Sequence, residues 1–206
     1  MERRDFLTNT LLAGAGSIGF MTESLAQTPN NSKPLKPFYV PPIAEPLLPG
    51  EMGINLRLKV RTRDTDNQFG SVEFAIAPKT IGPIPHIHDR LDEIMFVHEG
   101  EVHVMVGDEV TVVKAGGYHL RPHGIIHCFW NASDQPAHFT DLFFNQNFDD
   151  FFEELFFKLM PRWREQGIGR ASPEAVRQRA DLNKRFGLTQ FPEQRQAIID
   201  KYGLKA

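Results

Sequence analysis

The sequence predicts an all-β fold, a small barrel, followed by a helical extension at the C-terminus. Between residues 51 and 146, short runs such as Val102-Val104-Val106 alternate apolar and polar positions, and turn residues such as Gly107 and Asp108 separate them. Many short strands at close spacing are typical of antiparallel barrels and sandwiches. After residue 147 the apolar period changes to the helical one, which predicts that the β region ends there.

Size and charge restrict the classes of protein. The chain has 206 residues and a formal net charge of −3, which suits one globular domain. No block of lysine and arginine occurs, so we expect no nucleic-acid partner. The single cysteine, Cys128, excludes an intramolecular disulfide framework and a cysteine-rich zinc knuckle.

The first 26 residues have the features of an export signal. Arg3 and Arg4 precede Phe6 and a mildly apolar run, and small residues ending at Ala26 offer a cleavage site. The run is too short and too interrupted by polar residues to span a bilayer. The arginine pair resembles a twin-arginine signal, which predicts a periplasmic or secreted protein with no membrane span after signal removal. An ordinary secretion signal is the alternative.

The next segment, residues 27–50, is rich in proline and includes Pro41 and Pro42. Proline fixes φ and removes a backbone donor, so we expect an extended arm. Residues 51–146 then form the predicted barrel.

The last segment, residues 147–206, is the predicted helical extension. Apolar residues from Phe148 to Leu159 follow helical spacing, Ser172 and Pro173 predict a capped helix start, and a last helix is expected between Pro192 and Gly203. The aromatic stripe predicts a helix docked on the barrel or a dimer contact, and together with the arm it leads us to expect a homodimer.

Two stretches of the barrel region carry the residues suited to metal chemistry. His86 and His88 are two positions apart, so both imidazoles point to one face of a strand, and Glu93 can return on a neighbouring segment. The second stretch turns tightly at Pro122 and Gly124 into a strand where His127 points inward.

Both stretches resemble the paired signature motifs of the cupin superfamily. The second matches at Gly116, Pro122, Gly124, His127 and Asn131, and the first matches at His86, His88, Glu93 and Gly100. The first departs at its start, where Thr80 stands in place of the usual glycine and Gly82 follows. The resemblance implies a small jelly-roll, or double-stranded β-helix, barrel. It also implies that His86, His88, Glu93 and His127 bind one metal ion.

Three imidazoles and one carboxylate suit a divalent transition metal, namely Fe, Mn, Ni, Co, Cu or Zn, and disfavour Ca and Mg. Four protein ligands leave open positions, as in catalytic sites.

The remaining candidate residues are interpreted more simply. We expect exterior positions for His98 and His103. For His119 and His123 a place next to the metal ligands or a solvent-facing one is open, and we favour the solvent-facing one. We expect a solvated turn for Asp89, Arg90 and Asp92, and a Cys128 that packs as a small apolar residue. Phe74, Met95, Val97 and Phe129 are expected either to line an apolar cavity around the metal or to form plain barrel core.

Most of the mature chain resembles single-domain cupins related to quercetin 2,3-dioxygenase, including the stretch from Phe151 to Leu155 and the end around Tyr202. The resemblance implies a metal-dependent dioxygenase that uses O2 on a small aromatic or enol-bearing substrate, with Glu93 as ligand and catalytic proton acceptor. A non-catalytic periplasmic binding cupin and a metal-dependent isomerase or lyase are the alternatives. An acid or base in the cavity other than the ligands would favour the isomerase or lyase, and Glu73 and Tyr118 are the candidates.

Overall fold

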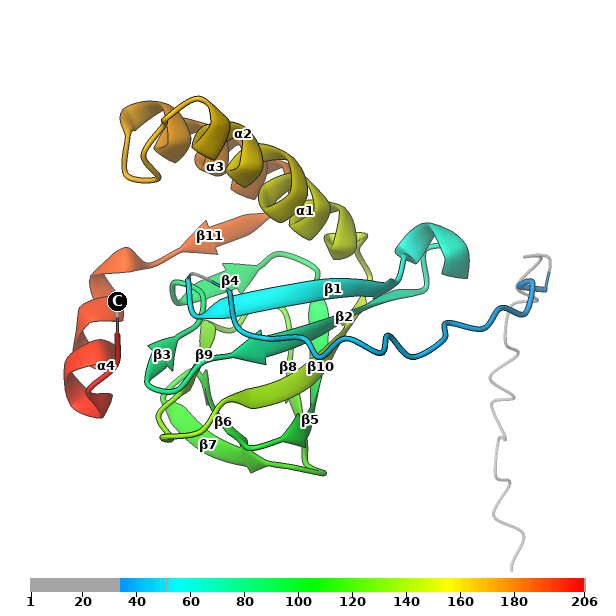
Figure 1. Ribbon diagram of the computed structural model, residues 1–206, viewed down its shortest axis with the longest axis horizontal. Helices are drawn as coiled ribbons and strands as arrows, with labels where there is room; N and C mark the ends of the chain where they lie inside the picture. The colour runs from blue at the N-terminus through cyan, green and yellow to red at the C-terminus, as the bar shows by residue number, and fades with distance from the viewer. Residues whose placement is uncertain (1–33, 51, 206) are drawn as a thin grey trace, which may run out of the picture. The chain divides into compact units, whose positions relative to one another are not determined.

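The computed structural model describes residues 34–50 and 52–205 (Figure 1). The predicted signal of residues 1–26 lies outside this part of the chain. Residues 34–50 contain neither helix nor strand, as the proline content predicts, and Leu47 is the one apolar side chain among them that is buried. No helix within the described residues is long and apolar enough to cross a membrane.

Ten strands form the barrel, and they run antiparallel in two sheets (Figure 1). One sheet has the order β1-β2-β10-β5-β8, and the other contains β4-β9-β6-β7, with β3 paired to β9. The strand bounds are β1 Ile54–Val60, β2 Phe69–Ile76, β3 Thr80–Ile81, β4 His86–His88, β5 Asp92–Glu99, β6 Glu101–Val106, β7 Glu109–Lys114, β8 Tyr118–Arg121, β9 His127–Asn131 and β10 Ala137–Phe144. The all-β prediction is confirmed.

The core lies between the two sheets, and strand alternation decides which side chains reach it. On β10, every second residue from Ala137 to Phe143 is buried, whereas the residues that alternate with them are partly exposed. Phe139 stacks on Phe74 of β2 with ring centroids 5.0 Å apart. Since each fully buried residue of this size contributes about 1.5–3 kcal/mol, the core fixes the register of the sheets.

Helices follow the barrel, as predicted. Their bounds are α1 Phe148–Glu154, a π-helical turn η2 Leu155–Leu159, α2 Met160–Glu165, α3 Pro173–Arg185 and α4 Arg195–Tyr202, with short 3-10 turns η1 Thr62–Thr65 and η3 Pro192–Gln194. Ser172 caps α3 by accepting a hydrogen bond from the Ala175 amide at 3.2 Å, and α4 ends at Gly203 with φ of 61°. Both helix boundaries agree with the prediction.

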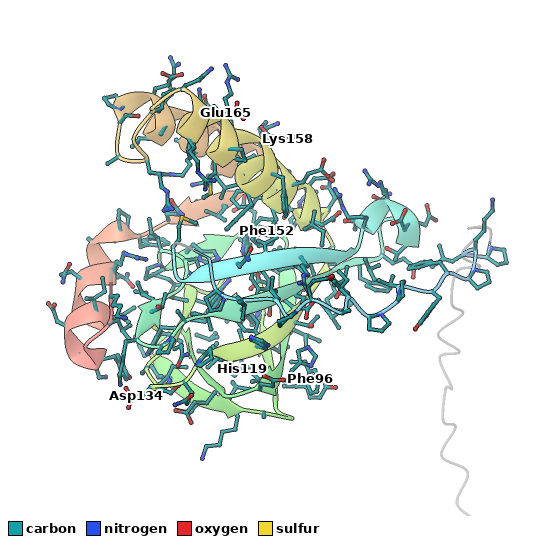
Figure 2. All side chains as sticks on the ribbon, viewed as in Figure 1. Phe96, His119, Asp134, Phe152, Lys158 and Glu165 are labelled. Carbon is teal, nitrogen blue, oxygen red and sulfur yellow. The ribbon has the colours of Figure 1, made fainter. Side chains whose placement is uncertain are left out.

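The aromatic stripe docks α1 on the barrel. Phe148 and Phe151 are buried, and Phe152 packs on Phe74 with centroids 5.5 Å apart. Figure 2 shows Phe152 between α1 and the barrel, while Lys158 and Glu165 lie farther along the helical segment. At the start of α1, Arg61 donates to Asp149 at 2.6 Å and to Asp150 at 2.8 Å.

The helix α4 covers the outer face of β9. Cys128 and Trp130 point outward from β9 and are fully buried in a second apolar cluster with Ile198 and Leu204. Burial raises the pKa of the Cys128 thiol to about 12, so the thiol stays protonated. The prediction that Cys128 packs as a small apolar residue is confirmed.

One strand was not predicted. β11, Leu188–Gln190, pairs antiparallel with β4, so that Leu188 lies opposite His88 and Gln190 opposite His86. The hydrogen bond from the Phe191 amide to the Pro85 carbonyl, 2.8 Å long, continues this pairing. The extension therefore completes the sheet at the strand that carries two predicted ligands (Figure 1).

Candidate metal centre

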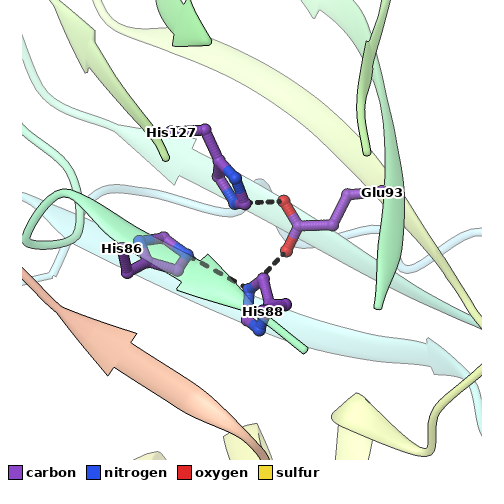
Figure 3. A group of neighbouring side chains, drawn as sticks. All are labelled: His86, His88, Glu93 and His127. Carbon is purple, nitrogen blue, oxygen red and sulfur yellow. Dashed lines mark hydrogen bonds and ion pairs between the residues drawn. The ribbon is translucent and has the colours of Figure 1, made fainter. Parts of the chain in front are cut away.

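The four predicted ligand residues meet inside the barrel. His86 and His88 stand on β4, Glu93 on β5 and His127 on β9, where His127 lies directly opposite His86 in the sheet. All four are buried, and the nitrogen or oxygen atom that each offers lies within 4.8 Å of the others (Figure 3). The predicted ligand set is thus one compact cluster that could hold a metal ion.

Backbone carbonyls fix the orientation of two of the rings. The Nδ1 of His86 lies 2.8 Å from the Ile84 carbonyl, and the Nδ1 of His127 lies 3.0 Å from the Ile125 carbonyl. A carbonyl only accepts, so each Nδ1 carries the proton and each Nε2 presents a lone pair. A partner on the far nitrogen is the usual way in which proteins orient metal-binding histidines.

The environment keeps the His86 ring neutral. Burial lowers its pKa well below the usual range, and the neighbouring His127 and His88 lower it further. The Nε2 atoms of His86 and His88 are 3.1 Å apart, so the two rings would repel each other if both of these nitrogens carried a proton. Neutral imidazoles are the form that binds metal ions.

Glu93 completes the cluster as an ionised carboxylate. Its oxygens lie 3.3 Å from His88 Nε2 and 3.4 Å from His127 Nε2. Burial by itself would raise the pKa of Glu93, but the charge of Arg121 and the close contacts with His127 and His88 lower it well below its usual range. The carboxylate is therefore charged at neutral pH.

A second layer of buried charge lies next to Glu93. Arg121 on β8 is 3.0 Å from Glu93 and 2.6 Å from Asp141 on β10, and all three side chains are almost fully buried. The guanidinium also lies 5.6 Å from the Phe129 ring centroid. Neither Arg121 nor Asp141 was predicted as a site residue. A sequence signal existed for Asp141, because it occupies an inward position between the apolar residues Phe139 and Phe143.

The cluster opens on a cavity of about 770 Å³. His86, Glu93 and Asp141 are among its polar lining residues. Its apolar wall comes from the barrel and from α1 with η2, through Phe74, Phe129, Phe143, Phe148, Phe151, Phe152, Leu155 and Phe156. The volume is in the usual range for small-molecule sites.

The predicted apolar lining is therefore half correct. Phe74 and Phe129 line the cavity, whereas Met95 and Val97 are fully buried in the core and do not. The aromatic stripe, predicted only as a packing surface, supplies much of the wall.

Three of the four other predicted histidine positions agree with the structure. His98 and His123 are exposed, and His123 contacts Asp92 at 2.7 Å. His103 is on the outer face of β6, where it stacks on Trp130. His119 is different: it pairs with Met95 across β5 and β8, so it shares the inward face and is half-buried. The solvent-facing prediction for His119 is wrong, because the register of β8 turns it inward.

Neither Glu73 nor Tyr118, the two candidate acids or bases, lines the cavity. Glu73 lies between two core residues on β2, and alternation turns it outward to within 3.9 Å of Lys59. Tyr118 is 68% exposed and stacks on Phe96 at a centroid distance of 4.4 Å. The non-ligand carboxylate that does line the cavity is Asp141.

The residues present fit a metal ion. His127 Nε2 is buried and makes no hydrogen bond within the described protein, although its ring is held in place through Nδ1. Burying an imidazole lone pair without a partner is unfavourable, and a metal ion would satisfy it. Three nitrogen donors and one oxygen donor suit a divalent transition metal.

Comparisons with known proteins support the fold. Residues 72–143 match the family model of the cupin domain, and the barrel is a small cupin barrel. A comparison with curated proteins found no match.

Several solved structures are similar to the barrel region. KdgF from a Halomonas species is 24% identical, with 48% of this chain and 86% of that chain covered and a TM-score of 0.43. An oxalate oxidase in complex with glycolate is 25% identical, with 48% and 54% covered and a TM-score of 0.42. A sugar phosphate isomerase of the cupin superfamily from Silicibacter pomeroyi is 24% identical, with 46% and 60% covered and a TM-score of 0.39. The chain thus spans less than two thirds of the latter two proteins.

Proposed function

We propose that the protein is a metal-dependent dioxygenase that acts on a small aromatic or enol-bearing molecule. One observation carries the proposal: two of the four ligand residues, His86 and Glu93, line a cavity whose wall is largely phenylalanine. A substrate in the cavity would therefore be in reach of the metal centre.

Two groups of residues have different roles in this proposal. His86, His88, Glu93 and His127 would hold one divalent transition metal, which supplies Lewis acidity and redox chemistry with O2 when bound. The phenylalanine side chains bind an aromatic ring and exclude water, which strengthens electrostatic interactions in the site.

Glu93 is the catalytic residue of this proposal. Its carboxylate lines the cavity and is ionised, so it can accept the hydroxyl proton of a substrate. Arg121 and the two histidines lower its pKa, so Glu93 becomes a stronger base when its oxygens move away from them.

A second candidate function has its own observation. Asp141 lines the cavity without belonging to the ligand set, and burial raises its pKa to about 6, against the opposing effect of Arg121. A carboxyl group of this kind could move a proton, as a metal-dependent isomerase or lyase requires. Oxygen dependence separates this candidate from the dioxygenase.

The test starts with the metal content of the mature protein, followed by oxygen uptake on a panel of flavonols and catechols. Variants His86→Ala and Glu93→Ala remove ligands, and His98→Ala, an exposed histidine on the outer face, is the matched control. We expect near-stoichiometric metal and oxygen uptake in the wild type and the control, and loss of both in the ligand variants.

The other outcomes change the conclusion in a defined way. Bound metal without oxygen uptake on any substrate would favour the isomerase, the lyase or a non-catalytic binding protein. A protein without metal after reconstitution with each of Fe, Mn, Co, Ni, Cu and Zn would refute the metal centre itself.

Two further proposals concern the protein in the cell. The arginine pair near the N-terminus supports twin-arginine export to the periplasm or beyond, and exchange of both arginines for lysine in the full chain should block it. The exposed aromatic side chain of Phe157, on the helix that covers the barrel, supports a homodimer, which gel filtration of the wild type and of Phe157→Glu would test.

A further inference from the structure

Three basic side chains contribute to the cavity lining: Arg170, Arg195 and Lys205. All three belong to the C-terminal extension, whereas the metal ligands belong to the barrel. Arg170 stands between α2 and α3, Arg195 begins α4, and Lys205 follows its end. In Figure 1 the turn between α2 and α3 lies above the barrel at the upper left, and α4 lies beside the barrel at the left. The extension thus brings positive charge to the cavity lining.

Arg195 is held at the cavity wall but not neutralised. Its Nη1 donates to the Gly82 carbonyl at 3.2 Å, and no carboxylate of the described residues pairs with it. The Gly82 amide in turn donates to the Phe129 carbonyl at 2.9 Å, two residues beyond the ligand His127. Burial lowers the pKa of Arg195, which shows that the protein around it disfavours an unpaired charge.

The other two cations also have no carboxylate partner within residues 34–50 and 52–205. Arg179 donates to the Arg170 carbonyl at 3.0 Å, and the charge of Arg170 adds to burial in lowering the pKa of Arg179. Lys205 is anchored by its backbone, because its amide donates to the Lys79 carbonyl. Its side chain is exposed and free to reach a ligand.

The acidic groups of the cavity cannot compensate these charges. Glu93 and Asp141 are the carboxylates of the described lining, and both pair with the buried Arg121. The rest of the lining is mostly apolar, with Thr80 and Gln190 as uncharged polar members. A low-polarity cavity with an unpaired arginine in its wall favours an anionic ligand, since a charge-assisted pair is strongest where water is excluded.

We infer that the cavity binds a small aromatic acid, with its carboxylate on Arg195 and its ring on the phenylalanine wall. Arg170 and Lys205 add longer-range attraction for the anion. Arginine suits this role because its planar group can donate two parallel hydrogen bonds to a carboxylate. The inference rests on the proposed function in one respect only: the proposed function decides which end of the ligand faces His86 and Glu93. A phosphate monoester shares the anionic chemistry, and the experiment distinguishes the two.

The experiment measures binding by calorimetry with three probes. Cinnamate carries a carboxylate, cinnamamide has nearly the same shape without charge, and phenyl phosphate carries a phosphate. Each probe is titrated into metal-loaded and chelator-treated full-length mature protein. The variants are Arg195→Met, Arg195→Lys and Lys205→Met. Lys184→Met is the control, because Lys184 is an exposed cation on α3 outside the cavity lining.

We expect cinnamate to bind at least tenfold more tightly than cinnamamide. Arg195→Met should weaken cinnamate binding about tenfold, as for hydrogen bonds to charged groups, and leave cinnamamide unchanged. Arg195→Lys should retain part of the preference, Lys205→Met should cost about twofold, and Lys184→Met nothing. Tighter binding of phenyl phosphate than of cinnamate would assign a phosphate ester and overturn the carboxylate.

Equal affinities for cinnamate and cinnamamide, or an unchanged preference in Arg195→Met, would refute the inference. These results are independent of the metal centre. If the protein never binds metal but still binds cinnamate more tightly than cinnamamide, the anion site is upheld and the proposed function fails. Bound metal with no acid preference would leave the proposed function standing and remove the anion site.

Discussion

The buried charges Glu93, Arg121 and Asp141 give the sharpest prediction about stability. Arg121 lies 3.0 Å from Glu93 and 2.6 Å from Asp141, so each attraction is about 5–6 kcal/mol at an effective dielectric constant of about 20. Dehydration of the guanidinium opposes this with several kcal/mol. Arg121→Met would leave two buried carboxylates without a cation, and we expect it to lower the free energy of unfolding by about 3–5 kcal/mol.

A double-mutant cycle separates the pairing from the rest of the loss. Asp141→Leu should cost about 1–3 kcal/mol, because Arg121 keeps Glu93 as a partner. The double variant Arg121→Met with Asp141→Leu should cost less than the sum of the single variants by about 2–3 kcal/mol, since it leaves only Glu93, and no longer Asp141, buried without a cation.

The assay is urea unfolding of chelator-treated protein at pH 7.5, followed by circular dichroism. Arg63→Met, which removes an exposed arginine in η1, is the control and should leave the midpoint unchanged. If the loss of unfolding free energy in the double variant equals the sum of the two single losses within about 0.5 kcal/mol, the charges do not stabilise one another. The description of a coupled buried triad would then be wrong.

Three further predictions follow from contacts elsewhere. Gly187→Ala should lower the denaturation midpoint and speed hydrogen exchange in β11, because Gly187 has φ of 58° and a methyl group there would lie 2.7 Å from Asp89 Oδ2. Arg61→Met should weaken the docking of α1, seen as faster exchange over Phe148–Glu154, because Arg61 pairs with Asp149, Asp150 and Glu153. Hydrogen bonds from Arg61 and Lys158 lower the pKa of Glu153 below its usual value. The stabilising effect of the ionised carboxylate is therefore present above the usual carboxyl pKa and is lost as the pH falls through the lowered one, so mild acid should loosen α1 in the wild type more than in Glu153→Gln.

The cluster of candidate ligands was predictable because its signals are local. His86 and His88 occupy alternate positions of one strand, and the turn at Pro122 and Gly124 directs the chain into the strand of His127. Glu93 required a return on a neighbouring strand, and the spacing to His88 leaves enough chain for the turn. Helix caps at Ser172 and Gly203 are equally local, and both are confirmed.

The errors concern the direction of side chains and pairing over long distances. Glu73 precedes Phe74, and adjacent strand residues face opposite sides, so both could not line the cavity. His119 faces inward because β8 pairs with β5 in a register that the sequence does not reveal. Strand β11 has only three residues, Leu188–Gln190, and its pairing with β4 depends on where the preceding helices place it.

The extension is better understood as part of the site than as an addition to it. Without β11, one edge of β4 would have no partner strand along the residues that carry His86 and His88. On its other edge, β4 pairs with β9 only at His86, so β11 supplies most of the pairing of this strand. Without α1 and η2, the cavity would lose Phe148, Phe151 and Phe152 and would open to water. Without Arg170, Arg195 and Lys205, it would lose the charges that favour an anion. Because a cupin barrel supports many reactions, the specificity of this protein should be decided by residues 147–205, and exchanging them for another sequence should change ligand choice before it changes metal content.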